Sequence, residues 1–194
     1  MTEMRPSLDA AYFDRLYAEA ADPWNFAESA YEHAKYQHTL QALPRERYGS
    51  ALEVGCSIGV LTASLAQRCG RLLAVDAAEA PLVQARRRCA DEAHVRIERR
   101  RVPEEWPDGT FDLILLSEVL YYLAPVDLRE VAQRAGQSTR SGGHILLVHW
   151  TGETDYPLSG DAATEWFISA IAPHARLLRQ EATSAYRLAL LERE

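Results

Sequence analysis

Residues 51–59, Ala-Leu-Glu-Val-Gly-Cys-Ser-Ile-Gly, decide the fold of this chain. An apolar run that contains Glu53 meets two glycines four residues apart, Gly55 and Gly59, and a helical pattern starts at Val60. This order predicts a strand, a tight turn and a helix. Gly55 allows turn angles that a side chain would forbid, and Gly59 lets the start of the helix pack close to a strand or a ligand.

A second apolar run, residues 72–75, ends in an acidic residue, Asp76. An acid at the end of a neighbouring parallel strand is placed to accept hydrogen bonds from ribose hydroxyls. A dinucleotide fingerprint would require glycines at positions 55, 57 and 60, and this chain has Gly, Ser and Val there. The pattern therefore argues against a dinucleotide ligand.

Strand and helix patterns alternate through the rest of the chain. The periodicity predicts helices at 8–20, 28–42, 79–92, 126–137 and 162–172, and strands before Gly55 and at 72–75, 94–98, 111–116, 144–148, 175–181 and 184–191. We expect Ser7 to cap the first helix and residues 141–143 to form a turn. Five strands follow the βαβ rhythm and two close the chain without a crossover helix, which predicts an α/β fold. The length suits one domain, 1–194, with a helical cap at 1–48 and a core at 49–194.

Composition narrows the classes of partner. The formal charge of −7 and the pI near 5.4 give no basic footprint for nucleic acid or for an anionic membrane, and a small or neutral partner is favoured. The N-terminus lacks the pattern of a signal peptide, and no apolar run is long enough for a membrane span. Cys56, Cys69 and Cys89 are odd in number and form no Cys-x-x-Cys, so we predict reduced thiols in a cytoplasmic protein, without zinc or disulfides.

Two further strands end in polar residues. The apolar run 111–116 is typical of a central parallel strand and ends in Ser117 and Glu118, and the strand 144–148 delivers His149 and Trp150. The carboxyl ends of parallel strands meet at the sheet edge where open α/β folds bind ligands, so these side chains are candidates for a site.

The first 36 residues hold seven of the seventeen aromatic residues. On the predicted helix 28–42, Tyr31, Lys35 and His38 make a line that faces either a ligand or solvent. His33 and His38 are five residues apart, which splays them on a helix, so no metal site is expected there.

Several motifs together carry a family resemblance. They are Phe13-Asp14-Arg15-Leu16-Tyr17, Asp22-Pro23-Trp24, Tyr31-Glu32, Ala34-Lys35-Tyr36, Glu53-Val54-Gly55-Cys56 with Gly59, Phe111-Asp112-Leu113-Ile114, Ser117-Glu118-Val119-Leu120-Tyr121-Tyr122-Leu123, Gly142-Gly143-His144 and His149-Trp150. From residue 51 onward the chain resembles class I S-adenosylmethionine-dependent methyltransferases. More narrowly, it resembles the NodS family, bacterial enzymes that N-methylate the terminal deacetylated glucosamine of chitooligosaccharides.

The resemblance implies a Rossmann-like three-layer sandwich whose seven-stranded, mostly parallel sheet has an antiparallel last strand. It also implies S-adenosylmethionine as cofactor, with S-adenosylhomocysteine as product. The residues expected to bind the cofactor are Glu53, Gly55, Cys56, Ser57, Gly59, Asp76, Ala77, Val102 and Ser117. One departure is Arg100-Arg101-Val102, where many relatives have an acid for the adenine amino group. We therefore expect the backbone amide of Val102 to bond the adenine ring.

An amine can attack a methyl group only when its lone pair is free of a proton. Glu118 and His149 are the candidates to take that proton or to hold the neutral amine, since an imidazole ordinarily titrates near neutral pH. Tyr121 completes the expected catalytic set, and the expected substrate-binding residues are Tyr31, Trp24, Lys35, Tyr122 and Trp150. The alternatives are a metal-independent O-methyltransferase and a non-catalytic cofactor-binding module. The chain leaves open whether the protein is a monomer or a dimer.

Overall fold

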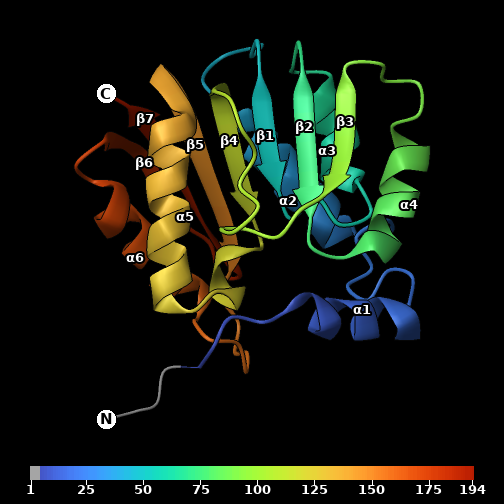
Figure 1. Ribbon diagram of the computed structural model, residues 1–194. Helices are drawn as coiled ribbons and strands as arrows, with labels where there is room; N and C mark the ends of the chain where they lie inside the picture. Colours follow the sequence, from blue (N-terminus) through green and yellow to red (C-terminus); the bar gives the residue numbers. More distant parts are fainter. Residues whose placement is uncertain (1–4) are drawn as a thin grey trace. The chain divides into compact units, whose positions relative to one another are not determined.

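A computed structural model describes residues 5–194 of the chain (Figure 1). The helices are α1 (Ala10–Glu19), α2 (Ala30–Gln41), α3 (Val60–Ala66), α4 (Glu79–Arg88), the 3-10 helix η1 (Leu120–Tyr122), α5 (Pro125–Ser138) and α6 (Gly160–Ile171). The strands are β1 (Ala51–Val54), β2 (Leu72–Asp76), β3 (Val95–Arg99), β4 (Phe111–Ser117), β5 (Thr139–Trp150), β6 (Ala175–Ala182) and β7 (Tyr186–Arg193).

The strands form a seven-stranded sheet in the order β3-β2-β1-β4-β5-β7-β6. The last strand, β7, runs antiparallel to both of its neighbours, β5 and β6. This confirms the predicted α/β fold with a mostly parallel sheet and a reversed last strand. The chain divides into two compact units, one of residues 9–101 and the other of residues 5–8 with 102–194. The predicted boundary between a cap at 1–48 and a core at 49–194 stays a prediction.

In the unit of residues 9–101, β1, β2 and β3 pair in parallel. All four residues of β1 are buried, which explains why this run lacks the polar alternation of a half-exposed strand. The register places Glu53 opposite Ala74 and Val54 opposite Val75, so Glu53 and Asp76 lie near the ends of adjacent strands. Helix α4 packs against β3, against α3 and against α1.

In the unit of residues 5–8 and 102–194, β4 and β5 pair in parallel, and β7 pairs antiparallel with both β5 and β6. The segments 113–116 and 145–148 are completely buried, as expected for adjacent central strands. Helices α5 and α6 pack against each other and against β5 (Figure 1). This packing supports β5, which ends in His149 and Trp150, and β4, which ends next to Glu118, pairs with β5.

The structure corrects the predicted start of the first helix. Asp9 caps α1, because its carboxylate accepts the backbone N–H of Tyr12 at 2.9 Å. The Ser7 hydroxyl instead accepts the backbone N–H of Ala124 at 2.7 Å and also contacts Asp127. Leu8 donates its N–H to the carbonyl of Tyr122, which keeps this segment out of the helix.

The structure also corrects the predicted turn at 141–143. Strand β5 runs through these residues, because Gly142 takes a φ of 72° and the register shifts between Phe111 and Leu113 of β4. A bulge of this kind absorbs extra residues without ending the strand. Helix α4 ends at Arg88, four residues before its predicted end.

The tight packing of Gly59 gives a stability prediction. An added Cβ at Gly59 would lie 2.8 Å from the Ala85 Cα, and the residue has a φ of +79°. Replacement by alanine therefore adds an overlap to a strained backbone, and we expect Gly59→Ala to lower the free energy of unfolding by about 3 kcal/mol or more. Urea unfolding followed by circular dichroism measures this.

The matched control is Gly109→Ala. Gly109 also has a positive φ, +102°, but an added Cβ there meets nothing within 4 Å. Its cost should be the backbone strain alone, about 1–2 kcal/mol. Equal losses for the two variants would contradict the role of the Gly59–Ala85 contact.

Candidate functional site

The glycine loop after β1 is held in an unusual backbone shape. Gly55, Ser57 and Gly59 have φ values of 83°, 48° and 79°, which only glycine adopts without strain. The N–H groups of Gly55 and Cys56 both donate to the carbonyl of Val75 on β2, at 2.9 and 3.1 Å. The loop is therefore fastened to the neighbouring strand and then opens directly into α3.

Asp76 faces this loop. One carboxylate oxygen accepts the N–H of Ser57 at 2.9 Å, and the other accepts the N–H of Ala78 at 3.0 Å. Burial raises the pKa of Asp76, whereas bonds from the backbone N–H groups of Ala78, Ser57 and Ala77 lower it. Asp76 thus lies at the end of β2, as the sequence predicted, and the structure adds the contact of its carboxylate with the glycine loop.

Glu53 is 2% exposed, and burial raises its pKa to about 7. One of its carboxylate oxygens, Oε2, is buried without a hydrogen-bond partner. A buried, unpaired acceptor is costly, so this oxygen suits a donor supplied by water or by a ligand. Burial also raises the pKa of the Cys56 thiol well above its usual range, which keeps that thiol protonated and unreactive.

Tyr17 of α1 contacts the glycine loop, and reasoning from the sequence missed it. Its hydroxyl lies 2.5 Å from the Ser57 hydroxyl. Tyr17 packs in an apolar cluster with Ile58, Ala78 and the partly buried Trp24, whose ring meets the Tyr17 ring edge-on at 5.7 Å. Tyr17 lies within the first motif of the family resemblance, and this was the available signal.

Helix α2 holds two predicted substrate-binding residues. Lys35 is 2% exposed, and its ammonium pairs with Glu32 at 2.9 Å. The Tyr31 ring is 40% exposed and lies 5.2 Å from the Lys35 Nζ. A ligand on α2 would therefore meet the ring of Tyr31, with the Lys35 charge held behind it.

In the other unit, Glu118 follows the end of β4 with a φ of 56°, unusual for a residue other than glycine. Its Oε2 accepts the Tyr121 hydroxyl at 2.6 Å and the backbone N–H of Trp150 at 2.9 Å. Such strain persists only where the surrounding contacts impose it. The structure thus brings Glu118, Tyr121 and Trp150 together, three of the predicted site residues.

Three tyrosine rings gather beside Glu118. Tyr156 stacks on Tyr121 with 5.3 Å between centroids and meets Tyr122 edge-on at 4.7 Å. Burial raises the pKa values of Tyr121 and Tyr122 well above their usual range, so both hydroxyls stay protonated. Reasoning from the sequence missed Tyr156, because it lies in the loop 151–159, where no periodic pattern marked it.

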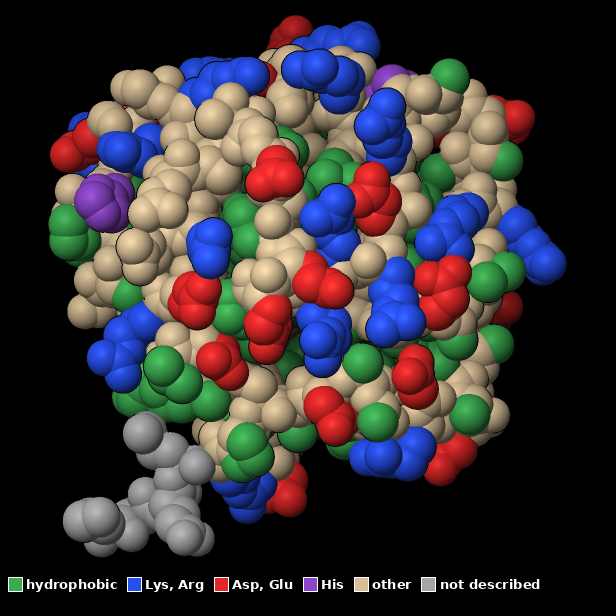
Figure 2. All heavy atoms as spheres, in the orientation of Figure 1, with side chains coloured by type: hydrophobic (Ala, Val, Ile, Leu, Met, Phe, Trp, Pro, Cys, Tyr) green, Lys and Arg blue, Asp and Glu red, His purple; other side chains and the backbone are tan. Residues whose placement is uncertain are grey.

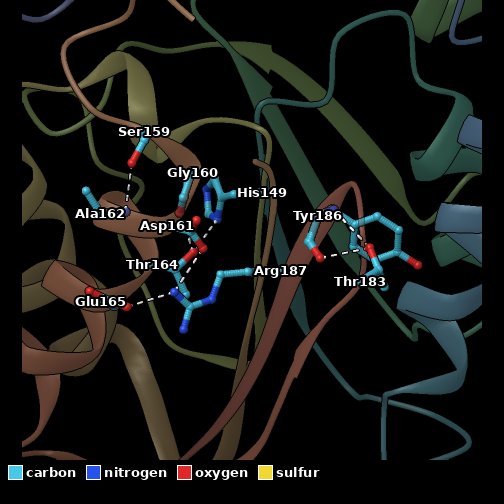
Figure 3. A network of polar contacts seen from close by, with 10 residues as sticks. All are labelled: His149, Ser159, Gly160, Asp161, Ala162, Thr164, Glu165, Thr183, Tyr186 and Arg187. Carbon is cyan, nitrogen blue, oxygen red and sulfur yellow. Dashed lines mark hydrogen bonds and ion pairs between the residues drawn. The ribbon is translucent and has the colours of Figure 1, made fainter. Parts of the chain in front are cut away.

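His149 is completely buried at the end of β5. Its Nε2 accepts the backbone N–H of Leu120 at 3.2 Å. Its Nδ1 lies 3.4 Å from the Thr164 hydroxyl of α6 (Figure 3). The ring is also 5.6 Å from the Tyr121 ring, edge-on. The structure therefore brings His149 to the same segment as Glu118 and Tyr121.

The remaining predicted residues lie close to strand ends. Ser117 is buried at the end of β4. Val102 comes three residues after β3 and precedes a cis peptide bond to Pro103. Within residues 5–194, no cluster of His, Cys, Asp and Glu suited to a metal ion occurs.

The surface and the helices bear on the class of partner. Acidic and basic side chains are interspersed over the face drawn in Figure 2, without a continuous basic stripe. Among residues 5–194, every helix is too short or too polar to span a bilayer.

A solved structure shares the fold of this chain. The Rossmann-like α/β fold matches that of the N-methyltransferase NodS from Bradyrhizobium japonicum WM9 in complex with S-adenosylhomocysteine, with a TM-score of 0.79 and 21% sequence identity. The match covers 95% of this chain and 97% of that structure. Residues 13–146 match the model of the family Nodulation protein S (NodS), and this chain belongs to that family.

Curated relatives support the assignment. Nodulation protein S of Rhizobium tropici is 34% identical over 132 residues, which is 66% of this chain and 55% of that protein. Nodulation protein S of Sinorhizobium fredii is 34% identical over 130 residues, which is 66% of this chain and 60% of that protein. The matched segment thus spans little more than half the length of these relatives.

The buried Glu53 gives a prediction for the dependence of stability on pH. Its pKa of about 7 lies above the value of 4.5 expected in the unfolded chain, so between these values the folded protein keeps a proton that the unfolded chain has lost. The free energy of unfolding should therefore fall as the pH rises from about 4.5 to about 7. Glu53 should account for about 3 kcal/mol of this fall in the free energy of unfolding.

Glu53→Gln should flatten this decline and stabilise the ligand-free protein at pH 8. Urea titrations at several pH values provide the measurement. The matched control is Glu19→Gln, at an exposed position in the last turn of α1, which should keep the wild-type slope. An unchanged slope in Glu53→Gln would show that Glu53 does not carry the effect.

Proposed function

We propose that this protein is an S-adenosylmethionine-dependent methyltransferase that N-methylates a small amine, such as a deacetylated amino sugar at the end of a chitooligosaccharide. The observation that carries the proposal is the pair of carboxylates, Glu53 and Asp76, on adjacent parallel strands beside the glycine loop. The family of the chain, and the S-adenosylhomocysteine bound by the similar NodS structure, support it.

The residues of unit 9–101 fit this cofactor. S-adenosylmethionine carries an ammonium and a sulfonium but no phosphate, and when bound it supplies an electrophilic methyl group. Glu53 offers a buried oxygen that lacks a donor, and Asp76 offers a carboxylate for ribose hydroxyls. The positive φ of Gly55 shapes the loop beside these carboxylates, and Gly59 lets the start of α3 approach Ala85 of α4.

The other proposed cofactor contacts follow the sequence prediction. They come from Cys56, Ser57 and Ala77 around the same loop, and from Ser117 and the backbone amide of Val102.

The residues of the other unit suit an amine acceptor. Tyr121 and Trp150 fix the position of the Glu118 Oε2 by hydrogen bonds. The Glu118 carboxylate can therefore accept a hydrogen bond from an amine N–H and then accept the proton that the nitrogen loses. The partly exposed ring of Tyr156 provides flat apolar surface of the kind that packs on a sugar face, and the buried Tyr122, which it meets edge-on, remains a proposed acceptor contact.

We assign His149 a role in positioning neighbouring residues and not in taking the proton. Its Nε2 accepts a backbone N–H, so this nitrogen does not serve as the base. Tyr31, Trp24, Lys35 and the exposed ring of Trp150 remain proposed acceptor contacts. The cytoplasm is the proposed compartment, in keeping with the free cysteines Cys56, Cys69 and Cys89.

Methyl transfer to the proposed acceptor is tested with S-adenosylmethionine labelled in its methyl group. The panel holds a chitooligosaccharide with a deacetylated terminal residue, the same oligomer fully acetylated, and a phenol. We expect label only on the free amine. Label on hydroxyl acceptors alone would establish O-methylation, and tight binding of S-adenosylhomocysteine without turnover would establish a binding module.

Glu118→Gln tests the residue proposed to hold the amine. It should lower kcat on the free-amine oligomer by about 100-fold, because the carboxylate no longer accepts the proton. Binding of S-adenosylhomocysteine, measured by calorimetry, should stay within about twofold of wild type. Glu130→Gln, on the exposed face of α5, is the control and should leave both quantities unchanged.

A further inference from the structure

The hydrogen bonds around His149 define its protonation state. Leu120 contributes a backbone N–H, which only donates, so the His149 Nε2 that receives it must carry a lone pair. An imidazole with an unprotonated Nε2 is neutral and carries its single proton on Nδ1. His149 is thus held as the Nδ1–H tautomer.

Thr164 completes this assignment. A threonine hydroxyl has one proton, and Thr164 donates it to the carbonyl of Gly160 at 2.8 Å. Toward His149 the same oxygen acts as the acceptor, and it lies 3.4 Å from the Nδ1 that carries the proton (Figure 3). The contacts of His149 with Leu120 and with Thr164 therefore agree on one tautomer.

The first turn of α6 is fixed in place around Thr164. A Cβ added at Gly160 would lie 1.9 Å from the Trp150 carbonyl oxygen, so the helix starts in direct contact with the end of β5. Arg187 of β7, the residue paired with His149 in the sheet, bridges Asp161 and Glu165 at 3.0 and 2.8 Å (Figure 3). The Thr164 hydroxyl therefore sits on a rigid support.

The path from Thr164 leads to the proposed acceptor site. The ring of His149 holds the N–H of Leu120, which is the first residue of η1. The next residue, Tyr121, donates its hydroxyl to Glu118, and Glu118 lies two residues before Leu120 at a strained φ. His149 is thus connected through the η1 turn to the Glu118 carboxylate.

We propose that Thr164 is a positioning residue for methyl transfer: by fixing the Nδ1–H tautomer of His149, it holds the η1 turn and so orients Tyr121 and Glu118 toward the acceptor amine. This proposal rests on the proposed function, because it assigns Glu118 to the amine. Its structural part, the tautomer and the turn, is independent of any substrate.

The test compares Thr164→Val with Thr164→Ser and with a matched control, Thr139→Val. Valine has the shape of threonine without the hydroxyl, whereas serine keeps it. Thr139 is also buried and also donates its hydroxyl to the carbonyl four residues earlier, at 2.7 Å, but it lies at the end of α5. It therefore controls for the loss of a buried hydroxyl in general.

Long-range 1H–15N NMR of the histidine rings reports the tautomer without turnover. Wild type and Thr164→Ser should show Nδ1 protonated, whereas Thr164→Val should show a mixture of tautomers and a shifted amide signal for Leu120. Thr139→Val should match wild type. An Nε2–H tautomer in the wild-type spectrum would overturn the proposal even if Thr164→Val failed to fold.

Kinetics use the chitooligosaccharide with a deacetylated terminal residue as the probe. Thr164→Val should lower kcat about tenfold, with the KM for S-adenosylmethionine within twofold of wild type, and Thr164→Ser should recover most of the loss. A kcat for Thr164→Val equal to that of Thr139→Val would reject the positioning role. Absence of amine methylation in the wild type would reject the proposed function, while the NMR spectra would still decide the tautomer and the turn.

Discussion

The unit of residues 9–101 depends on the hydrogen bonds that the Asp76 carboxylate accepts from the backbone around the glycine loop. A carboxylate at the end of β2 accepts one N–H from the loop after β1 and one from the start of α4. The glycine loop, the end of β2 and the start of α4 are thereby held around one carboxylate. Because burial makes that charge expensive, the arrangement is stable only while the N–H groups stay aimed at it.

For Glu53, in contrast to Asp76, hydrogen bonds do not offset the cost of burial. It is buried on the strand next to Asp76, yet one of its oxygens has no partner among the described residues. The raised pKa of Glu53 expresses the cost of this arrangement in the ligand-free protein. A site that stays costly until a donor arrives is a common property of binding sites, where local stability is given up for affinity.

In the unit of residues 5–8 and 102–194, a different set of contacts holds the carboxylate of Glu118. Glu118 sits at a strained backbone angle, and the surrounding bonds come from a tyrosine hydroxyl, from the end of β5 and, through His149, from α6. Each of these groups is itself buried or paired, so the carboxylate has little freedom. Such preorganisation is what the alignment of an acceptor requires, because positioning supplies much of the rate in a displacement reaction.

The sequence by itself determined the order of strands and helices, the glycine loop with its acidic partner on the next strand, and the family. These follow from local rules: apolar periodicity, the backbone freedom of glycine, and residues that recur at fixed spacing. Only the tertiary structure decided that Asp9 and not Ser7 caps α1, that Lys35 is buried against Glu32, and that Tyr156 and Thr164 join the candidate site. Those contacts form between side chains brought together by packing, and no local pattern encodes which hydroxyl or ring will meet them.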